Sequence, residues 1–324
     1  MSAKTILITG GHGFIGSNMI HYYLNKYPDY QIVNIDYNTE AANPENMHCP
    51  DQKNRYAFRR VDIRNVYAIN HLFEQYDITD IIHFAAETRS RENVGEIRLY
   101  EQTNVLGTMN LLYAAQSAWM DDEHQPKPAY KTSRFHHVSL TNNGHSTLYT
   151  LSKANADDMV QSFHEKYGLN IVTTASPEIF GPMQQDEELI PLSIHQALDG
   201  KLELLERDEK KRDWLFVSDL CEAIDTVFHL GEAGQRYETG SIARLSDREL
   251  VQQIAVSLNE NFPGNILDTQ YIKQTNTLIQ PKTANIIQNQ IPGFEPATAF
   301  ETGLSITRDW YIKKYKHADL ARKQ

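Results

Sequence analysis

Hydrophobic and polar positions along the first half of the chain predict strands and helices that follow one another in turn. Short apolar, β-branched runs are typical of buried strands, and apolar residues spaced three or four apart are typical of helices. Strands that alternate with helices indicate βαβ units and a doubly wound parallel sheet, so we expect an α/β fold. The expected strands are Lys4–Thr9, Gln31–Asp36, Tyr56–Val61, Ile78–Phe84, Phe135–Ser139 and Ile171–Ala175, and the expected helices are Ile15–Tyr27, Val66–Tyr76, Leu99–Trp119 and Leu151–Tyr167.

The regular alternation weakens after residue 176, which suggests a change of domain. We expect residues 1–176 to form the first domain and 177–324 to form mainly a smaller α/β substrate-binding domain. A run of mixed charge at 206–213 is interpreted as a solvated loop. The helix-like stretch Leu220–Leu230 predicts a return to the first domain at about 214–241.

Composition and charge narrow the class of protein. The chain has 324 residues, of which 40% are hydrophobic, enough to fill a sizeable core. Its formal net charge of −11 argues against a nucleic-acid partner, because phosphate backbones attract basic surfaces. The chain has no run of 18 or more apolar residues, so no membrane span is expected. Its two cysteines, Cys49 and Cys221, form no disulfide framework, and we expect a reducing, cytoplasmic location.

A glycine-rich turn follows the first expected strand. The segment ITGGHGFIGSN places Gly10, Gly13 and Gly16 between that strand and a helix, and Asp36 ends the next strand. This context is typical of a Rossmann-type dinucleotide site, in which glycines let the backbone approach a pyrophosphate at the start of a helix. Asp36 would accept hydrogen bonds from ribose hydroxyls and repel an extra phosphate, so we predict NAD rather than NADP. The alternative is a tight turn followed by a surface aspartate.

Tyr149 and Lys153 lie four residues apart at the start of an expected helix, so their side chains share one face. A nearby ammonium lowers the pKa of a phenol. A tyrosine whose pKa is lowered in this way can take a proton from a sugar hydroxyl while a hydride is transferred to nicotinamide. The alternative is an ordinary surface Tyr and Lys on an amphipathic helix. Because the pair follows an expected dinucleotide-binding site in the same domain, we favour the catalytic interpretation.

Several segments together resemble a known family. They are TGGHGFIGSN, HFAAET (83–88), TNVLGT (103–108), YTLSKANAD (149–157), FGP (180–182), LIPL (189–192), RDWLFVSDL (212–220) and FETGLSITRDWY (300–311). The chain is similar to the extended short-chain dehydrogenases/reductases, and in particular to the dTDP-glucose 4,6-dehydratase branch. The likeness extends over nearly the whole chain.

This resemblance implies tightly held NAD, a nucleotide-diphosphate sugar as substrate, and a homodimer packed through the helices near 99–119 and 151–167. Arg212 would bind the substrate diphosphate, because a guanidinium fork suits phosphate oxygens. The implied cofactor contacts are Gly10, Gly13, Phe14, Ile15, Gly16, Asp36, Asp62, Ile63, Ala85, Ala86, Asn104, Tyr149 and Lys153. The implied substrate contacts are Glu87, Arg89, Asn142, Glu178, Leu189, Ile190, Pro191 and Arg212.

The chain departs from this branch where the branch places its acid and base. Those dehydratases oxidise C4, lose water across C5 and C6, and return the hydride to C6, using a Thr-Asp-Glu run after the fifth strand. Here a gapless match sets Leu140, Thr141 and Asn142 against that run, and a shift by one residue sets Thr141, Asn142 and Asn143 against it. In both registers the carboxylates are missing, and an amide cannot transfer a proton.

Two other positions also differ from the branch. Residues 88–91 read Thr-Arg-Ser-Arg where the branch has Ser-His-Val-Asp, which adds Arg89 and Arg91. These arginines are either surface charges or a site for an extra anionic group such as a uronate. Glu178 and Ile179 replace a polar pair before the GP turn. A carboxylate beside a diphosphate would be repulsive, so Glu178 either points away or indicates a different ligand.

Three functions remain open on these observations. The first is a nucleotide-sugar dehydratase with its acid and base elsewhere, for which Glu87, Glu178 and His145 are candidates. The second is a nucleotide-sugar 4-epimerase or oxidoreductase, which needs the Tyr–Lys pair and Ser139 or Thr141 to hold the sugar hydroxyl. The third is a catalytically weak paralogue that retains NAD as a structural ligand.

Overall fold

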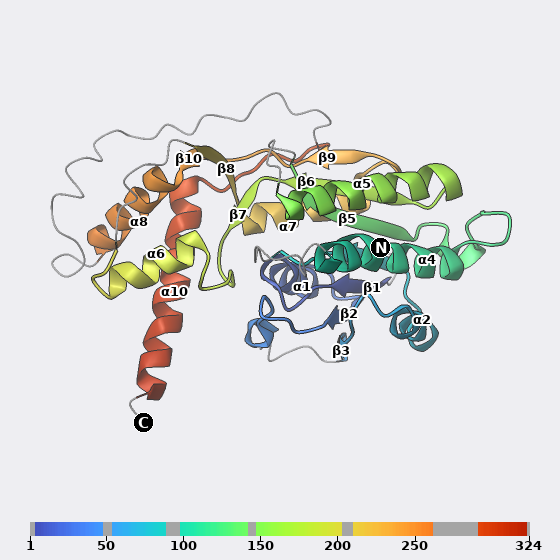
Figure 1. Ribbon diagram of the computed structural model, residues 1–324, viewed down its shortest axis with the longest axis horizontal. Helices are drawn as coiled ribbons and strands as arrows, with labels where there is room; N and C mark the ends of the chain where they lie inside the picture. The colour runs from blue at the N-terminus through green and yellow to red at the C-terminus, as the bar shows by residue number, and fades with distance from the viewer. Residues whose placement is uncertain are drawn as a thin grey trace. The chain divides into compact units, whose positions relative to one another are not determined.

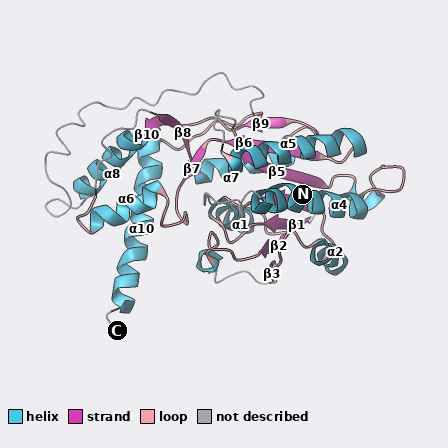
Figure 2. Ribbon diagram, viewed as in Figure 1, coloured by secondary structure: helices cyan, strands magenta, loops and turns pink. Residues whose placement is uncertain are grey.

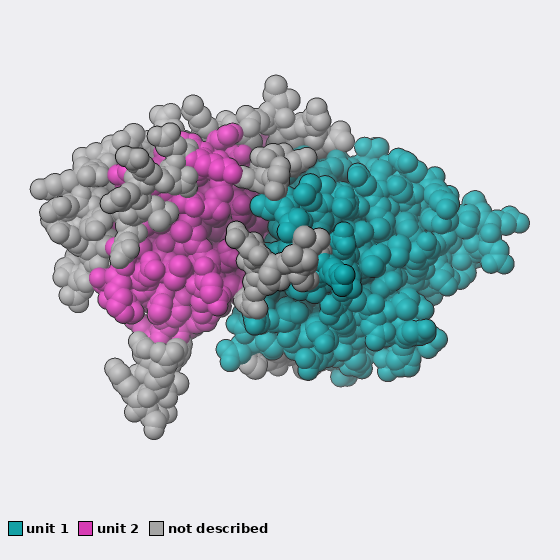
Figure 3. Space-filling view, viewed as in Figure 1, with its two compact units in different colours: residues 1–176, 221–239, 288–294 teal, residues 177–220, 240–287, 295–324 magenta. Residues whose placement is uncertain are grey.

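The structure, a computed structural model, describes residues 4–47, 54–88, 98–141, 147–202, 210–261 and 291–322 (Figure 1). The chain divides into two compact units, coloured teal and magenta in Figure 3. Unit 1 comprises residues 1–176, 221–239 and 288–294, and unit 2 comprises 177–220, 240–287 and 295–324. The segment that rejoins unit 1 is therefore 221–239, where the sequence suggested about 214–241. The short segment at 288–294 had no counterpart in the sequence analysis.

The centre of unit 1 is a parallel sheet, as predicted. Its described residues form seven strands in the order β3-β2-β1-β4-β5-β6-β9, and every neighbouring pair is parallel. The chain moves outward from β1 in one direction and then in the other, so the gap between β1 and β4 is the switch point of a Rossmann-type sheet. The strands are β1 (Lys4–Thr9), β2 (Tyr30–Asp36), β3 (Tyr56–Arg60), β4 (Asp80–His83), β5 (Arg134–Leu140), β6 (Ile171–Ser176) and β9 (Arg236–Glu238).

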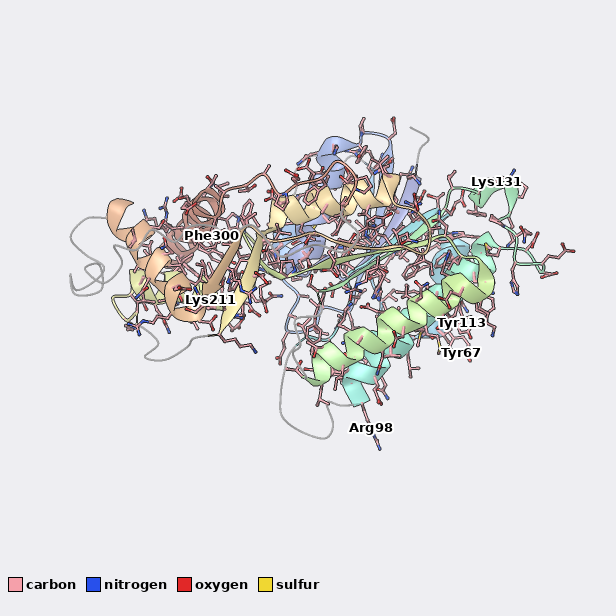
Figure 4. All side chains as sticks on the ribbon, turned by 90° about the horizontal axis from the view of Figure 1, so that it is seen from above. Tyr67, Arg98, Tyr113, Lys131, Lys211 and Phe300 are labelled. Carbon is pink, nitrogen blue, oxygen red and sulfur yellow. The ribbon has the colours of Figure 1, made fainter. Side chains whose placement is uncertain are left out.

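Helices cover both faces of this sheet. On one face α1 (Phe14–Lys26) packs against α7 (Val217–Leu230) through the rings of Tyr23 and Phe228. On the other face, α2 (Val66–Gln75), α4 (Thr108–Trp119) and α5 (Leu148–Tyr167) contribute to one apolar cluster. Figure 4, in the colours of Figure 1, shows green α5 and pale gold α7 on opposite sides of the sheet. None of the helices in the described part is long and apolar enough to cross a bilayer.

Short helical turns connect these elements (Figure 2). They are η1 (Pro44–Met47) and η3 (Pro128–Tyr130), both 3-10 turns, and the π-helical turn η2 (Glu101–Gly107). The helix expected at Leu99–Trp119 therefore contains a wider π-helical turn before α4 begins. Gly107 ends this turn against Ile63, where a Cβ atom would overlap the isoleucine side chain. A glycine at this position therefore leaves room for the Ile63 side chain.

The core explains why the strands were recognisable from the sequence. Ile6, Leu7 and Ile8 are consecutive residues of β1, and all three are fully buried. Consecutive burial requires cover on both faces, which is the usual state of a parallel sheet and produces continuous apolar runs. Leu7 belongs to the cluster under α2, α4 and α5, together with Phe135 of β5. The prediction of an α/β fold with a buried parallel sheet is confirmed.

Unit 2 contains a smaller sheet with its own helices. In its described residues β7 (Glu178–Phe180) pairs in parallel with β8 (Lys211–Phe216), which pairs in antiparallel fashion with β10 (Ala243–Ser246). The helices are α6 (Leu189–Leu198), α8 (Asp247–Asn261) and α10 (Phe300–Arg322). The interpretation of 206–213 as a loop is wrong for residues 211–213, because they pair with β10 and lead into the buried residues Trp214 to Phe216.

Candidate active site

The glycine-rich turn joins β1 to α1 at the switch point of the sheet. Gly10 has φ +71°, a left-handed conformation that favours glycine. A Cβ atom on Gly10 would lie 2.8 Å from the backbone nitrogen of Ala85, so the turn after β1 touches the loop after β4. A Cβ on Gly16 would collide with the carbonyl oxygen of Gly10. Two of the three predicted glycines are thus required by close backbone contacts.

The start of α1 has the features of an anion site. Gly13 occupies the N-cap position, and the first turn of this 13-residue helix carries no acidic side chain. Phe14 is buried and Ile15 is half-buried, so both help to fix the helix beneath the turn. The first N–H groups of a helix have no partner within it and attract phosphate oxygens. The glycine turn and this helix start therefore fit the pyrophosphate of a dinucleotide.

Asp36 ends β2 beside the glycine turn. Its carboxylate accepts hydrogen bonds from the backbone nitrogens of His12 at 3.0 Å and Asn38 at 2.8 Å. These bonds fix the acid at the edge of the site while leaving it partly exposed. A carboxylate has more acceptor positions than these two bonds use, so ribose hydroxyls can still be bound. The position agrees with the role predicted for Asp36.

Asp62 and Ile63 follow β3. Burial alone would raise the pKa of Asp62, but the hydrogen bonds from Arg64 lower it below its usual range. Arg64 Nε lies 2.9 Å from both carboxylate oxygens of Asp62. Ile63 is buried, and its carbonyl accepts a hydrogen bond from Asn110 at 2.9 Å. A contact of either residue with an adenine ring stays a prediction.

The loop after β4 is held in place by Asn104, which is buried. The Asn104 amide accepts a hydrogen bond from the Glu87 backbone nitrogen at 2.7 Å and donates to the Glu87 carbonyl at 3.0 Å. It also donates to the Ser152 hydroxyl of α5 at 2.9 Å. Ala85 donates from its backbone to the Thr9 hydroxyl at 3.1 Å, and Ala86 is half-buried between these anchors. Asn104 thus positions the loop, and its direct cofactor contact stays a prediction.

Tyr149 and Lys153 lie on α5, one helical turn apart. A capping box between Thr147 and Thr150 fixes the first turn, which contains Tyr149. The Tyr149 ring is half-buried, with its centroid 6.3 Å from that of Tyr100. Lys153 is buried, and its Nζ donates to the carbonyl oxygen of Val138 in β5 at 2.9 Å. Lys153 is therefore anchored to β5, and the catalytic role of the pair stays a prediction.

Burial and nearby charges set the titration of Lys153. Burial lowers the pKa of Lys153 to about 8, because removal of water disfavours the ammonium. The Asp157 carboxylate opposes this change, and the Arg236 guanidinium reinforces it. A lysine in this range is still charged at neutral pH, so it can stabilise a neighbouring tyrosinate.

Asp157 links α5 to the sheet beneath Lys153. It accepts hydrogen bonds from His137 Nε2 at 2.9 Å, the Ser139 hydroxyl at 2.8 Å and Arg236 Nη1 at 2.7 Å. Burial would raise the pKa of Asp157, but its bond to His137 and the nearby positive charges hold that pKa well below its usual range. Ser139 is buried and donates its hydroxyl proton to Asp157, so it supports this carboxylate. A direct role for Ser139 toward a sugar hydroxyl stays a prediction.

Thr141, just beyond β5, meets a carboxylate that the sequence analysis did not consider. Its hydroxyl donates to Glu238 Oε2 at 2.6 Å, and its backbone nitrogen donates to the Ser176 carbonyl at 2.8 Å. Glu238 is the last residue of β9. The nearby Arg236 also donates from Nη2 to the Leu140 carbonyl at 2.6 Å. Residues of β9 therefore hold the end of β5 in a fixed position.

Asp157, Arg236 and Glu238 were all missed from the sequence. Asp157 could have been found, because it lies four residues after Lys153 on the same helix face. Arg236 and Glu238 had no such local signal, since each meets its partner across a large separation in sequence. Glu238 and Thr141 are 97 residues apart, and Arg236 and Asp157 are 79 apart.

Unit 2 contains the predicted diphosphate ligand, Arg212, and two carboxylates beside it. Its guanidinium is hydrogen-bonded to Asp247, and Nη1 lies 3.9 Å from Glu178 Oε1. The guanidinium also lies over the Trp214 ring, 5.1 Å from the ring centroid. The Glu178 carboxylate thus lies near the Arg212 guanidinium, and its meaning for the ligand stays a prediction. A phosphate that binds Arg212 would have to compete with these acids.

The remaining predicted substrate residues are divided between α6 and segments outside the described residues. Leu189 is half-buried, whereas Ile190 and Pro191 are buried in the first turn of α6. Arg89 and Asn142 lie outside the described residues, as do Arg91, Asn143 and His145. Contacts of these residues with a nucleotide sugar therefore stay predictions.

Comparisons with known proteins agree with the family resemblance. A dTDP-glucose 4,6-dehydratase from Haemophilus influenzae is 32% identical to the chain over 335 residues, covering 95% of this chain and 97% of the relative. An enzyme of the same name from Neisseria meningitidis is 31% identical, covering 95% and 93% of the two chains. The family resemblance inferred from the motifs is confirmed.

Solved structures give the same result for the fold. A crystal structure of dTDP-glucose 4,6-dehydratase from Bacillus anthracis in complex with NAD matches with a TM-score of 0.76 and 30% identity, covering 97% of this chain and 98% of that one. A UDP-glucose 4-epimerase from Thermotoga maritima matches with a TM-score of 0.74 at 18% identity, and shows the shared fold alone. A model of the NAD dependent epimerase/dehydratase family matches residues 6–243, and the chain belongs to that family.

Proposed function

We propose that this chain binds NAD in unit 1 and oxidises a nucleotide-diphosphate sugar at C4, with Tyr149 as the base. The observation that carries the proposal is the state of Lys153, which is buried at the end of β5 one turn after Tyr149. Its pKa of about 8 leaves a charged ammonium at neutral pH. That charge favours the tyrosinate form, which can accept the proton of a sugar hydroxyl.

The cofactor part of the proposal rests on residues of unit 1 and on the relatives. The glycine turn and the start of α1 fit a pyrophosphate, and Asp36 is held where ribose hydroxyls would be bound. The family is described as NAD dependent, and the Bacillus anthracis relative was solved with NAD. When bound, NAD supplies the acceptor for a hydride. The protein's residues then orient the sugar, accept its hydroxyl proton and balance the charge.

The substrate class rests on the names of the relatives and on Arg212. The similar enzymes are named for dTDP-glucose, and Arg212 is the predicted ligand of the substrate diphosphate. Binding of a diphosphate would exchange the Asp247 and Glu178 carboxylates at Arg212 for phosphate oxygens. A guanidinium can donate two parallel hydrogen bonds to either partner, since both a carboxylate and a phosphate offer a pair of oxygens.

Dehydration is proposed to be impaired. Water loss needs a base to remove a proton at C5 and an acid at the leaving hydroxyl, and each such group typically contributes about 10²–10⁴-fold. The run Thr141-Asn142-Asn143 offers a hydroxyl and two amides in their place. This favours the second candidate function, a nucleotide-sugar 4-epimerase or oxidoreductase, which needs hydride transfer without elimination. A catalytically weak NAD-binding paralogue is the third candidate.

The test is incubation of the protein and NAD with dTDP-, UDP-, GDP- and CDP-glucose. We expect NADH absorbance with at least one of these sugars, and little product lighter by one water in mass spectra. Tyr149→Phe should lower NADH formation by about 10²–10⁴-fold while leaving NAD binding and the unfolding temperature near those of the parent. Parent-like turnover by Tyr149→Phe would refute the role of Tyr149. Efficient formation of the dehydrated product would refute the proposal that dehydration is impaired.

A further inference from the structure

Glu238 lies at the edge of the sheet where ligands of this fold bind. It is the last residue of β9, which pairs in parallel with β6, and β6 pairs in parallel with β5. The carboxyl ends of these strands therefore meet at one edge. In open α/β sheets the ligand lies in the crevice outside that edge. Glu238 is thus on the same edge as the end of β5, which Lys153 contacts through the Val138 carbonyl.

The Glu238 carboxylate is oriented by two neighbours from unit 1. The Thr141 hydroxyl donates to Oε2 at 2.6 Å, and Arg236 Nε lies 3.5 Å from Oε1. Arg236 is itself fixed, because it also bonds to Asp157 and to the Leu140 carbonyl. The Glu238 side chain keeps 22% of its surface exposed. It is therefore both positioned and accessible.

The direction of the Thr141 hydrogen bond decides which group can take up a proton. A hydroxyl has one proton to donate, and Thr141 directs it at Glu238. An ionised carboxylate can accept about four hydrogen bonds, so Glu238 retains acceptor capacity beyond Thr141 and Arg236. Thr141 has no comparable affinity for protons. Glu238 is therefore the member of the pair that can act as a base.

We propose that Glu238 is a further catalytic residue, the base that removes a proton from the sugar carbon next to C4. The proposal rests on C4 oxidation by Tyr149 and Lys153, since the resulting ketone makes that proton acidic. In the step, the C–H bond breaks and an O–H bond forms on Glu238. The electron pair of the C–H bond moves into the C–C bond and onto the C4 oxygen, giving an enolate. Return of a proton from Glu238 restores the ketone.

One carboxylate gives proton exchange more readily than water loss. Elimination also needs an acid at the leaving hydroxyl, and the amides of Asn142 and Asn143 cannot supply one. Exchange needs a single base, which removes and returns the proton. We therefore expect deuterium from solvent to enter the sugar faster than water leaves it.

The experiment is incubation of the NAD-loaded protein with dTDP-, UDP-, GDP- and CDP-glucose in D₂O. NADH is followed by absorbance, deuterium in the recovered sugar is followed by mass, and its position is found by NMR. The measured quantity is deuterium incorporated per NADH formed. Glu238→Gln keeps the shape and removes the base, so this ratio should fall at least about 100-fold. Glu238→Asp keeps a carboxylate and should retain more exchange than Glu238→Gln.

Glu232→Gln is the matched control. It makes the same chemical change at an exposed residue before β9, away from the carboxyl edge. Its exchange ratio should equal that of the parent. An undiminished ratio in Glu238→Gln would overturn the proposal, as would NADH formation by the parent without deuterium uptake. If the parent forms no NADH with any of the four sugars, the proposed hydride transfer is wrong, and the role of Glu238 falls with it.

Discussion

At the scale of single residues, burial gives Lys153 a different chemistry from that of a surface lysine. Its Nζ is enclosed by β5 and α5 and bonded to a carbonyl, an environment that lowers its pKa toward neutrality. The nearby Asp157 and Arg236 act in opposite directions on the same ammonium. The spacing of Tyr149 and Lys153 was visible in the sequence. Of the two charges that act on Lys153, Asp157 lies only four residues further along α5, whereas Arg236 is distant along the chain and could be found only from the fold.

Hydride transfer should therefore have an alkaline limit set by Lys153. The pKa of Lys153 is lowered from 10.5 to about 8. Below that pH the ammonium is present and stabilises tyrosinate, and above it the ammonium is lost. The rate of NADH formation should thus fall as pH rises through about 8. Asp157→Asn removes a charge that favours the ammonium, so the fall should begin at lower pH. A limit near pH 10.5, or one that Asp157→Asn does not move, would contradict this assignment.

Asp36 should make the protein select NAD over NADP. Its carboxylate is anchored by two backbone N–H groups, so it cannot easily turn away from a 2′-phosphate. Like charges about 4 Å apart at a partly exposed site repel by about 1–4 kcal/mol, so NADP should bind at least about tenfold more weakly. Competitive titration of cofactor-free protein measures the ratio. Asp36→Asn should lower the ratio of NAD affinity to NADP affinity. Equal affinity of the parent for both cofactors would disprove the assignment.

At the scale of elements, the apolar pattern was sufficient to predict the strands that are buried on both faces. The first six expected strands end within a few residues of β1 to β6, and β1 matches its expected range. The pattern failed for short or charged strands. β9 is the three residues Arg-Tyr-Glu, and β8 begins with the charged residues Lys-Arg-Asp before its apolar half, so the start of β8 and the whole of β9 lack an apolar run. Their pairing partners define them, and partners cannot be read from a local window.

The close contact of the glycine turn with the loop after β4 can be tested, because a glycine elsewhere in the chain has the same backbone conformation without such a contact. Gly10 has φ +71° and Gly168, which caps α5, has φ +66°. An added Cβ would lie 2.8 Å from the Ala85 nitrogen at Gly10, and would meet nothing within 4 Å at Gly168. Both Gly→Ala variants should lose about 1–2 kcal/mol to left-handed backbone strain. Gly10→Ala should lose a further 1–3 kcal/mol, roughly, to the overlap with the loop after β4.

Unfolding temperatures with and without NAD would measure this difference. Gly168→Ala should keep the stabilisation that NAD gives to the parent, because Gly168 lies at the far end of α5 from Tyr149. Gly10→Ala should unfold at a lower temperature than Gly168→Ala without NAD, and it should also lose most of the stabilisation that NAD gives to the parent. Equal losses in the two variants would show that the contact with Ala85 is unimportant.

At the scale of the whole molecule, the sequence and the structure agree on the α/β architecture. The motifs that carried the family resemblance extend from residue 9 into α10, and curated relatives align over 95% of the chain. Assembly was implied by that resemblance alone. In unit 1, the described surface of α4 and α5 exposes Tyr113 (47%) and Leu151 (53%), and Leu106 (45%) precedes α4. Such residues on neighbouring helices are typical of a contact surface.

We therefore propose a homodimer that packs through α4 and α5, and predict that Tyr113→Glu will disrupt it. The Tyr113 ring packs against Phe163 of α5 and is half exposed, so a charge there would be buried in a dimer without a partner (Figure 4). Light scattering should give about twice 37.2 kDa for the parent and a mass near 37.2 kDa for the variant. Tyr67→Glu is the matched control, because Tyr67 is 84% exposed on α2, which is not one of the two helices of the proposed contact. The proposed interface would be contradicted if the parent protein is a monomer, or if Tyr67→Glu dissociates the dimer as much as Tyr113→Glu does.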